Sequence, residues 1–196
     1  MGQLKMIFDA TTTAIPEPVV PEGFTLRTVR DGELAEYSAL RVSAEFKAWT
    51  PEDMAKYLER ALPDAIYLAV ETATGRFAAS AGAENSANPD HPEFGNLGWV
   101  MAHPDMRGRH LGRTVSLAAM RRLYRAGYRT FSLSTDDFRL PAVKTYLQLG
   151  WRPWLIEPDM IERWEKVGRE LGLEREAAES FPADHKFAPK VEGGAL

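Results

Sequence analysis

The sequence of 196 residues contains no cysteine. Disulfide frameworks, thiol catalysis and cysteine metal sites are therefore excluded, and we expect a reducing, cytoplasmic location and no bound metal. Long apolar runs are also missing, because the longest one covers only the six residues from Ala65 to Val70. A membrane-spanning helix needs roughly 20 such residues, so we expect no membrane association. The first 18 residues carry one lysine and one short apolar run, which does not fit a secretory signal.

An excess of positive charge is missing too. The chain has 24 Lys and Arg against 28 Asp and Glu, a formal charge of -4, so its bulk charge does not point to nucleic acid. The distribution is less even, since residues 107–129 contain seven arginines and no acid. Such a run forms either a solvated helix face or a site for an anion, and its position in the fold has to decide between them.

The residues that are present have the composition of one soluble globular domain, with 44% apolar and 27% charged residues. Residues 1–22 include three prolines and no sustained period, which predicts an irregular N-terminal arm. We expect the main domain at residues 23–157. Residues 158–196 are expected to form a C-terminal helix and a tail that pack on the same domain.

Periodicity and turn signals indicate the order of the elements. Phe24 to Thr28 alternates as a strand, Asp31 is positioned to cap the following helix, and Thr50 with Pro51 is typical of the start of a second helix. Later elements are expected as strands at 66–71, 77–83, 96–102, 130–134 and 151–156, and as helices that begin near 112, 141 and 158. This order predicts an α/β fold with a mixed sheet flanked by helices.

The most informative segment joins the strand that ends at Ala102 to the helix that begins near Gly112. A strand that leads into a glycine-containing turn and then a helix directs free backbone N–H groups and the positive end of the helix dipole at one point, which favours phosphate. The turn is neither a P-loop nor a dinucleotide fingerprint. Gly108 and Gly112 enclose three residues, Arg113 stands where the P-loop has lysine, and no G-x-G-x-x-G occurs here.

Residues 107–112, Arg-Gly-Arg-His-Leu-Gly, resemble the Gln/Arg-x-x-Gly-x-Gly/Ala signature of the GNAT superfamily of acetyl-CoA-dependent N-acetyltransferases. His110 replaces the central glycine of that signature. Residues 142–151 resemble a second family element, Ala-x-x-x-Tyr-x-x-x-Gly-Phe/Trp. The resemblance covers residues 24–156 in element order and is sharp from Trp99 to Trp151. It implies a central, mostly antiparallel mixed sheet of about six to seven strands flanked by helices.

The resemblance implies that acetyl-CoA is the co-substrate. Backbone groups on the strand would bind the pantetheine arm and polarise the thioester carbonyl, and the turn with the start of the helix would bind the pyrophosphate. The implied coenzyme-binding residues are Val100, Met101, Ala102, Arg107, Gly108, Arg109, His110, Leu111, Gly112 and Arg113.

The remaining basic residues have weaker assignments. Arg139 and Lys144 could reach coenzyme phosphates, although members of the family often have asparagine at the position of Arg139. Arg121, Arg122 and Arg125 lie further along the helix and are expected to form a solvated face.

Tyr146 is implied as the catalytic residue, a general acid that protonates the leaving thiolate. An unperturbed tyrosine pKa of about 10 keeps the hydroxyl protonated at neutral pH. The attacking amine must lose a proton, but the sequence does not identify the base. Glu84, His91, Glu93 and His103 are interpreted as solvated or structural residues.

The acceptor, under this interpretation, is an amine of a small molecule or peptide. Residues 45–50 and 84–95 are expected to frame its groove, and Phe46 and Trp49 serve either an aromatic pocket or plain packing. Tryptophans at 151, 154 and 164 leave open both cover of a sheet edge and a homodimer contact. Two other functions remain as alternatives: a non-catalytic acetyl-CoA-binding regulatory module and, more weakly, a nucleic-acid-binding domain that uses the arginines.

Overall fold

The computed structural model describes residues 2–86 and 88–173. The chain divides into two compact units: the smaller combines residues up to Ile7 with those from Ser134 onward, and the larger spans Phe8–Leu133. The described residues contain a seven-stranded mixed sheet and five α-helices, which confirms the predicted fold class.

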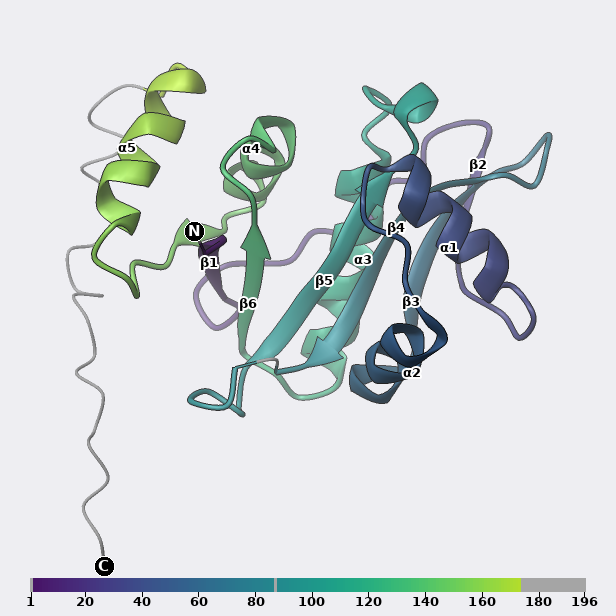
Figure 1. The fold of residues 1–196 in the computed structure, drawn as a ribbon, viewed down its shortest axis with the longest axis horizontal. Helices are drawn as coiled ribbons and strands as arrows, with labels where there is room; N and C mark the ends of the chain where they lie inside the picture. The colour runs from purple at the N-terminus through teal and green to yellow at the C-terminus, as the bar shows by residue number, and fades with distance from the viewer. Residues whose placement is uncertain (1, 87, 174–196) are drawn as a thin grey trace, which may run out of the picture. The chain divides into compact units, whose positions relative to one another are not determined.

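From β2 onward the elements follow the predicted order, and Figure 1 labels the five α-helices and strands β1 to β6. In chain order they are β1 (Leu4–Asp9), β2 (Phe24–Thr28), α1 (Leu34–Ser43), α2 (Pro51–Arg60), β3 (Ala61–Glu71), β4 (Phe77–Asn85), β5 (Gly95–Ala102), the 3-10 turn η1 (Pro104–Met106), α3 (Leu111–Arg125), β6 (Thr130–Thr135), α4 (Leu140–Gln148), β7 (Arg152–Pro153) and α5 (Met160–Glu170).

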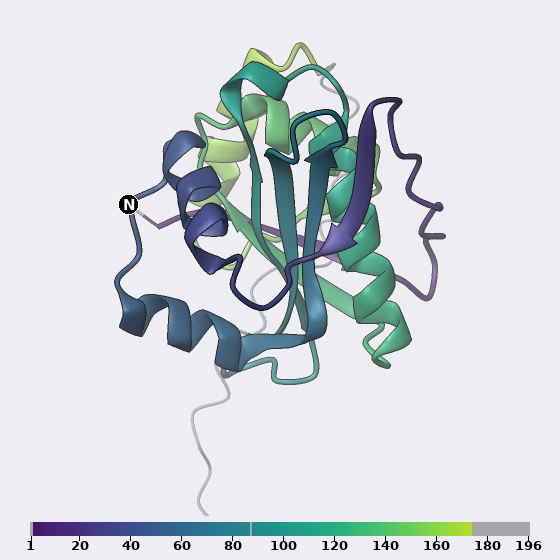
Figure 2. The ribbon, with the colours of Figure 1, turned by 90° about the vertical axis from the view of Figure 1, so that its right-hand side faces the viewer.

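The larger unit contains most of the sheet, with its strands in the order β2-β3-β4-β5-β6. Neighbours from β2 to β5 are antiparallel, and β5 pairs with β6 in parallel. Helix α3 covers one face of these strands, while α1 and α2 cover the other (Figures 1 and 2). In the smaller unit, β1 pairs antiparallel with β7, with Met6 opposite Pro153.

A hydrophobic core fills the space between the first two helices and the strands. Its buried residues are Tyr37, Leu40, Ala44, Met54, Tyr57, Ile66, Leu68, Val70, Phe77 and Met101. Each large apolar side chain that leaves water in this way stabilises the fold by roughly 1.5–3 kcal/mol. The same layer carries the aromatic and polar side chains described below, so the core also supports the candidate site.

The segment predicted as an irregular arm, residues 1–22, contains strand β1, so the prediction was wrong for residues 4–9. Pairing with its neighbours in the sheet makes this segment a strand, and one of them, β7, lies almost 150 residues away in the chain. The residues that follow β1 lie along α3. The Thr114 hydroxyl donates to the Val19 carbonyl at 2.8 Å, and Arg121 donates to the Ile15 carbonyl at 3.0 Å.

Two of the three arginines predicted to form a solvated face have structural contacts instead. Arg121 also forms an ion pair with Glu17, and its Nε atom is buried. Arg122 donates to the Pro63 carbonyl at 3.1 Å. Both guanidinium groups therefore hold backbone that packs beside α3, a role that no local sequence pattern specifies.

The helix caps differ in how well they were predicted. Thr50 caps α2 as expected, and Asp53 completes a capping box. Asp31 does not cap α1, whose N-cap residue is Glu33 without a side-chain cap bond. The Glu33 carboxylate accepts two hydrogen bonds from Arg27, at 2.7 and 2.8 Å, which use the acid for an ion pair. Strand β7 is shorter than the predicted 151–156, and at its start the Trp151 N–H donates to the Tyr146 carbonyl of α4 at 3.0 Å instead of to a strand.

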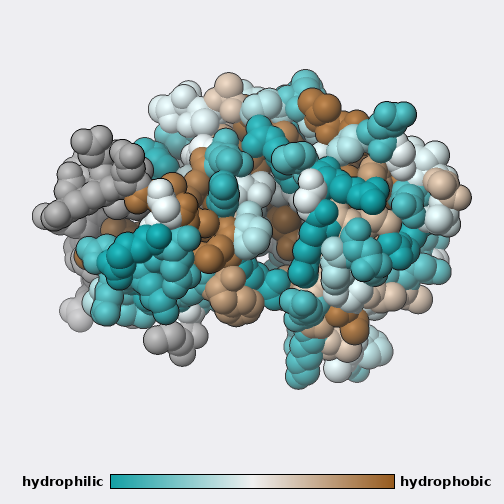
Figure 3. All heavy atoms as spheres, turned by 90° about the horizontal axis from the view of Figure 1, so that it is seen from above, coloured by the Kyte–Doolittle hydropathy of each residue, from teal (hydrophilic) through white to brown (hydrophobic). Residues whose placement is uncertain are grey.

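No helix within residues 2–86 and 88–173 is both long and apolar enough to cross a membrane. Hydrophilic residues predominate on the face shown in Figure 3, with hydrophobic residues in small groups between them.

Candidate functional site

The turn between β5 and α3 has the backbone conformation of an open loop. The Asp105 N–H donates to the His103 imidazole at 3.3 Å and orders η1, after which Arg107 is extended. Gly108 has φ +78° and His110 has φ +59°, so both lie in the left-handed region. Glycine adopts this conformation without strain, and histidine is among the residues that tolerate it better than most.

The N-terminus of α3 faces open space. A Cβ atom added at Gly108 or Gly112 would meet no atom within 4 Å. His110 is the N-cap residue but makes no side-chain cap bond, and the first turn of this 15-residue helix contains no acid. The first backbone N–H groups and the positive end of the dipole are therefore available to an anion. The exposed Arg107 and Arg109 side chains flank the turn and add positive charge.

Strand β5 contains a bulge at Trp99 and Val100, the second of which is the first of the three residues predicted to bind pantetheine. Gly82 faces Gly98 and Ser80 faces Met101, so Ala81 of β4 lies opposite two residues of β5. Trp99, the first of the two, has φ +50°. A bulge of this kind bends the strand and takes backbone groups out of the regular ladder.

The parallel pairing of β5 with β6 lies at the start of both strands. Its pairs are Gly95 with Phe131 and Asn96 with Ser132, and β5 continues for six more residues to Ala102. The family resemblance implies that the thioester binds where these two strands separate. The assignment of Val100, Met101 and Ala102 to that location stays a prediction.

Glu84 is a buried carboxyl group beside this bulge. It is 1% exposed, and a Cβ at Gly98 would overlap its carboxylate, so only glycine permits this position. Arg60 forms an ion pair with it at 3.4 Å. No hydrogen bond of good geometry from the described residues reaches either carboxylate oxygen. Burial raises the pKa of Glu84 to about 7, against the opposing effect of Arg60 and Asn96.

Two buried tyrosine side chains, Tyr37 of α1 and Tyr57 of α2, lie near Glu84. Gly82 leaves room for the Tyr57 hydroxyl, which a Cβ at that position would overlap. The Tyr37 and Tyr57 hydroxyls are 3.3 Å apart, and both rings are almost fully buried. Burial raises the pKa of both tyrosines, so they stay protonated around neutral pH.

Tyr146 belongs to the smaller unit, where α4 carries it. Its ring packs edge-on against Trp151, with centroids 6.3 Å apart, and the residue is 5% exposed. Burial raises the pKa of the Tyr146 hydroxyl, which holds it in the protonated form that a general acid needs. Its role stays a prediction.

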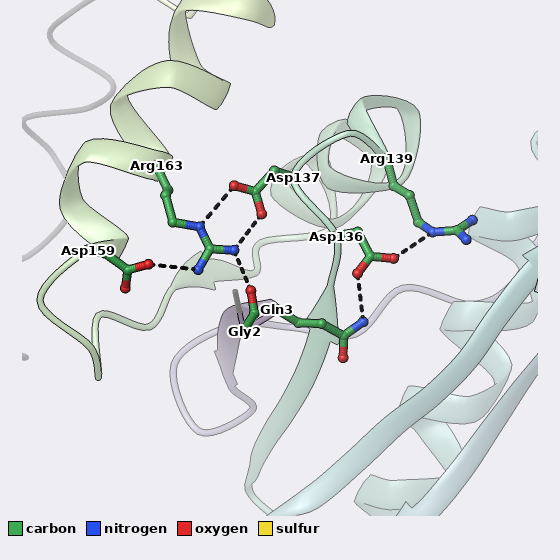
Figure 4. A network of polar contacts seen from close by, with 7 residues as sticks. All are labelled: Gly2, Gln3, Asp136, Asp137, Arg139, Asp159 and Arg163. Atoms are coloured by element: carbon green, nitrogen blue, oxygen red, sulfur yellow. Dashed lines mark hydrogen bonds and ion pairs between the residues drawn. The ribbon is translucent and has the colours of Figure 1, made fainter.

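A polar network in the smaller unit orders the segment before α4 (Figure 4). Arg163 of α5 donates to both carboxylate oxygens of Asp137, at 2.9 and 2.6 Å, and to the Gly2 carbonyl at 2.7 Å. Arg139 donates through Nε to Asp136 at 3.0 Å, and Gln3 donates to the same carboxylate. The side chain of Arg139, one candidate for a coenzyme phosphate, is therefore oriented by an acid three residues earlier.

The larger unit brings together all ten residues predicted to bind the coenzyme, on the end of β5, the turn and the start of α3. Sequence reasoning interpreted Glu84 as a solvated or structural residue, and its burial contradicts the solvated alternative. One signal was available: β4 reads Phe-Ala-Ala-Ser-Ala-Gly-Ala-Glu-Asn, so Glu84 is the one acid among small residues. Without the register of β5, nothing placed that acid over Gly98.

Comparison with known proteins gives a consistent result. The family model for the acetyltransferase (GNAT) family matches residues 31–151. A mycothiol acetyltransferase of Thermobispora bispora is 30% identical over 158 residues, which cover 74% of this chain and 52% of that protein. One from Streptomyces bingchenggensis is 33% identical over 159 residues, which cover 79% of this chain and 50% of that protein. The chain spans about half the length of these curated relatives.

Solved structures agree on the fold. A GCN5-related N-acetyltransferase from Sphaerobacter thermophilus superposes with a TM-score of 0.62 at 25% identity, covering 78% of this chain and 49% of that one. A tandem GNAT protein from the clavulanic acid biosynthesis pathway gives a TM-score of 0.60 at 22% identity, covering 78% and 50%. With the turn, the bulge and the family match in agreement, the chain belongs to the GNAT acetyltransferase family.

Proposed function

We propose that the protein transfers the acetyl group of acetyl-CoA to an amine by direct attack of the amine on the thioester. The observation that carries the proposal is the uncapped N-terminus of α3, which faces open space directly after a bulged strand. The mycothiol acetyltransferase relatives support acetyl transfer to a small molecule. Since this chain spans only about half the length of these relatives, the activity and the acceptor are both proposed here.

Backbone donors in the larger unit bind the coenzyme in this proposal. The N–H groups of residues 108–113 bind the pyrophosphate, where the dipole of α3 favours negative charge. N–H groups of residues 100–102, at and directly after the bulge, donate to the thioester oxygen and stabilise the negative charge that develops there. The coenzyme itself supplies the activated acyl group.

Glu84 is the proton acceptor in this proposal. As the new N–C bond forms, the attacking nitrogen becomes strongly acidic, and the Glu84 carboxylate takes its proton directly or through one water. A pKa of about 7 places this group near the optimum for a base at neutral pH. The C–S bond then breaks, and Tyr146 donates its hydroxyl proton to the leaving thiolate.

Coenzyme binding tests the first part of the proposal. Coenzyme A should raise the melting temperature of the wild type and of Gly112→Ala, because a methyl group at this position meets no neighbour. Gly112→Asp should abolish the increase, since it puts negative charge where the pyrophosphate binds. Asp is favourable in the first turn of a helix, so this variant should fold. An undiminished increase in Gly112→Asp would contradict the assignment.

Turnover tests the second part. Release of free thiol from acetyl-CoA should depend on added amine, and Tyr146→Phe should lower kcat by on the order of 10²-fold while coenzyme A still raises its melting temperature. Equal kcat in the two proteins would assign Tyr146 to the core instead. Coenzyme binding without thiol release, over a broad panel of amines, would favour a non-catalytic acetyl-CoA-binding module.

A further inference from the structure

A cage of three aromatic rings surrounds the Arg41 guanidinium in the larger unit. Its central carbon lies 3.9 Å from the centroid of the Trp49 ring, 4.0 Å from that of Trp99 and 5.2 Å from that of Phe46. The Trp49 and Trp99 rings are nearly perpendicular, with centroids 4.7 Å apart. These four residues are called the Arg41 cage below.

Three local devices build the cage. Helix α1 ends in a Schellman motif, in which the Phe46 N–H donates to the Arg41 carbonyl and the Glu45 N–H donates to the Val42 carbonyl. This motif brings the Phe46 ring to the Arg41 side chain. The capping box of α2 begins at Thr50 and orders Trp49 just before it. Trp99 comes from the bulge in β5.

The charge inside the cage has no ionic partner among residues 2–86 and 88–173. Arg41 is 4% exposed. Its Nε atom donates to the Lys47 carbonyl at 2.9 Å, but the buried Nη1 atom has no hydrogen-bond partner in this part of the chain. No carboxylate there lies within 4.0 Å of the guanidinium. Burial lowers the pKa of Arg41, which reflects the cost of desolvating a charge without a counter-ion.

A buried arginine normally pairs with a carboxylate or another anion, and aromatic faces compensate for only part of the missing water. The three rings of the cage are each only partly buried, so the guanidinium is covered by aromatic side chains that themselves reach the surface. The backbone of Trp99 leads directly into Val100–Ala102, where the proposed function places the thioester. An anion bound to Arg41 would therefore belong to the molecule that attacks that thioester.

We propose that the acceptor amine also carries a carboxylate, and that Arg41 binds this carboxylate through its free N–H groups. The proposal rests on the proposed acetyl transfer. A planar, singly charged carboxylate matches the fork of N–H groups that arginine presents. It is also cheaper to bring among aromatic rings than a strongly hydrated phosphate. Arg41 is then a specificity-determining residue that distinguishes amino acids from simple amines.

Matched pairs of acceptors test the proposal. L-alanine is compared with L-alaninamide and 4-aminobutyrate with butylamine, in the thiol-release assay with acetyl-CoA. In the wild type, kcat/KM should be at least about tenfold higher for the carboxylate-bearing member of a pair. Arg41→Met should bring that ratio close to one, and Arg41→Lys, which keeps the charge, should restore part of it. Arg125→Met, which removes an exposed arginine of α3, should leave the ratio unchanged.

A binding measurement keeps the test independent of turnover. Propionate, but not propionamide at equal ionic strength, should change the tryptophan fluorescence of the wild type and of Arg125→Met, and this difference should vanish in Arg41→Met. The increase in melting temperature with coenzyme A verifies that each variant is folded. If no amine is acetylated, the proposed function fails, and propionate binding alone decides the role of Arg41. Equal kcat/KM within each pair, or a preference that survives in Arg41→Met, would overturn the inference.

Discussion

Glu84 illustrates how two glycines and one acid define a chemical environment. Gly98 provides the space for its carboxylate, and Gly82 provides the space for the Tyr57 hydroxyl on the same face of the sheet. A side chain at either glycine would displace these polar groups. The carboxyl is held away from water, so it is protonated at acidic pH and becomes a proton acceptor only around neutrality.

The pH dependence of turnover should reflect this carboxyl. With its pKa raised to about 7, kcat/KM of the wild type should rise with pH through that value, because only the ionised form accepts a proton. Glu84→Gln should lose this limb and fall by about 10²–10⁴-fold at pH 8. Profiles of both proteins are measured with the same amine, whose own titration is common to both. A limb that persists in Glu84→Gln would assign the proton acceptor to another group.

At the scale of an element, the connection between α1 and α2 contains a residue with a Cβ atom in a conformation that favours glycine. The Schellman motif requires a left-handed residue, and Glu45 occupies that position with φ +67°. Glycine would be the favourable residue there, since a Cβ atom makes this conformation costly. The motif nevertheless forms. It places the Phe46 ring against Arg41, four residues before the capping box that begins at Thr50.

Glu45→Gly should therefore stabilise the protein by about 1 kcal/mol, the cost of a left-handed conformation for a residue with a Cβ. Urea unfolding measures the change. Glu45→Ala is the matched control, because it also removes the exposed ion pair with Arg107 but keeps the Cβ. Exposed pairs of this kind contribute little. A gain of the same size in Glu45→Ala would attribute the effect to the carboxylate and not to the backbone.

At the scale of the whole molecule, the free energy of unfolding should depend on pH through the titration of Glu84. The pKa of Glu84 is about 7 in the folded protein, against the ordinary value of 4.5 that applies in the unfolded chain. Between these values the folded chain binds more protons than the unfolded one, so stability falls as pH rises and the contribution is complete below pH 4.5. The shift corresponds to on the order of 3 kcal/mol by pH 8.

Unfolding by urea at pH 5 and pH 8 compares the wild type with Glu84→Gln, which does not titrate. The stability of the variant relative to the wild type should increase from the lower to the higher pH. A difference between the two proteins that is the same at both values would contradict a raised pKa in the folded state.

The sequence alone determined the features that depend on a few neighbouring residues. Thr50 and Asp53 form their capping box and Gly108 adopts its left-handed turn, because caps and tight turns are set by local backbone conformation. The residues from Arg107 to Gly112 are a local signature as well, and their spacing identifies the family. The elements from 24 onward were predictable in order for the same reason, since period and turn residues are local signals.

Only the tertiary structure decided the rest, because those features depend on partners far away in the chain. Strand β1 forms by pairing with strands more than 100 residues away, and Arg121 binds backbone over 100 residues before it. Glu84 is buried because the register of β5 places Gly98 beneath it, and the Arg41 cage joins a helix end, a loop and a bulge. Burial and the loss of solvent are properties of the folded packing, so the pKa of Glu84 and the unpaired charge of Arg41 had no signature in the local sequence.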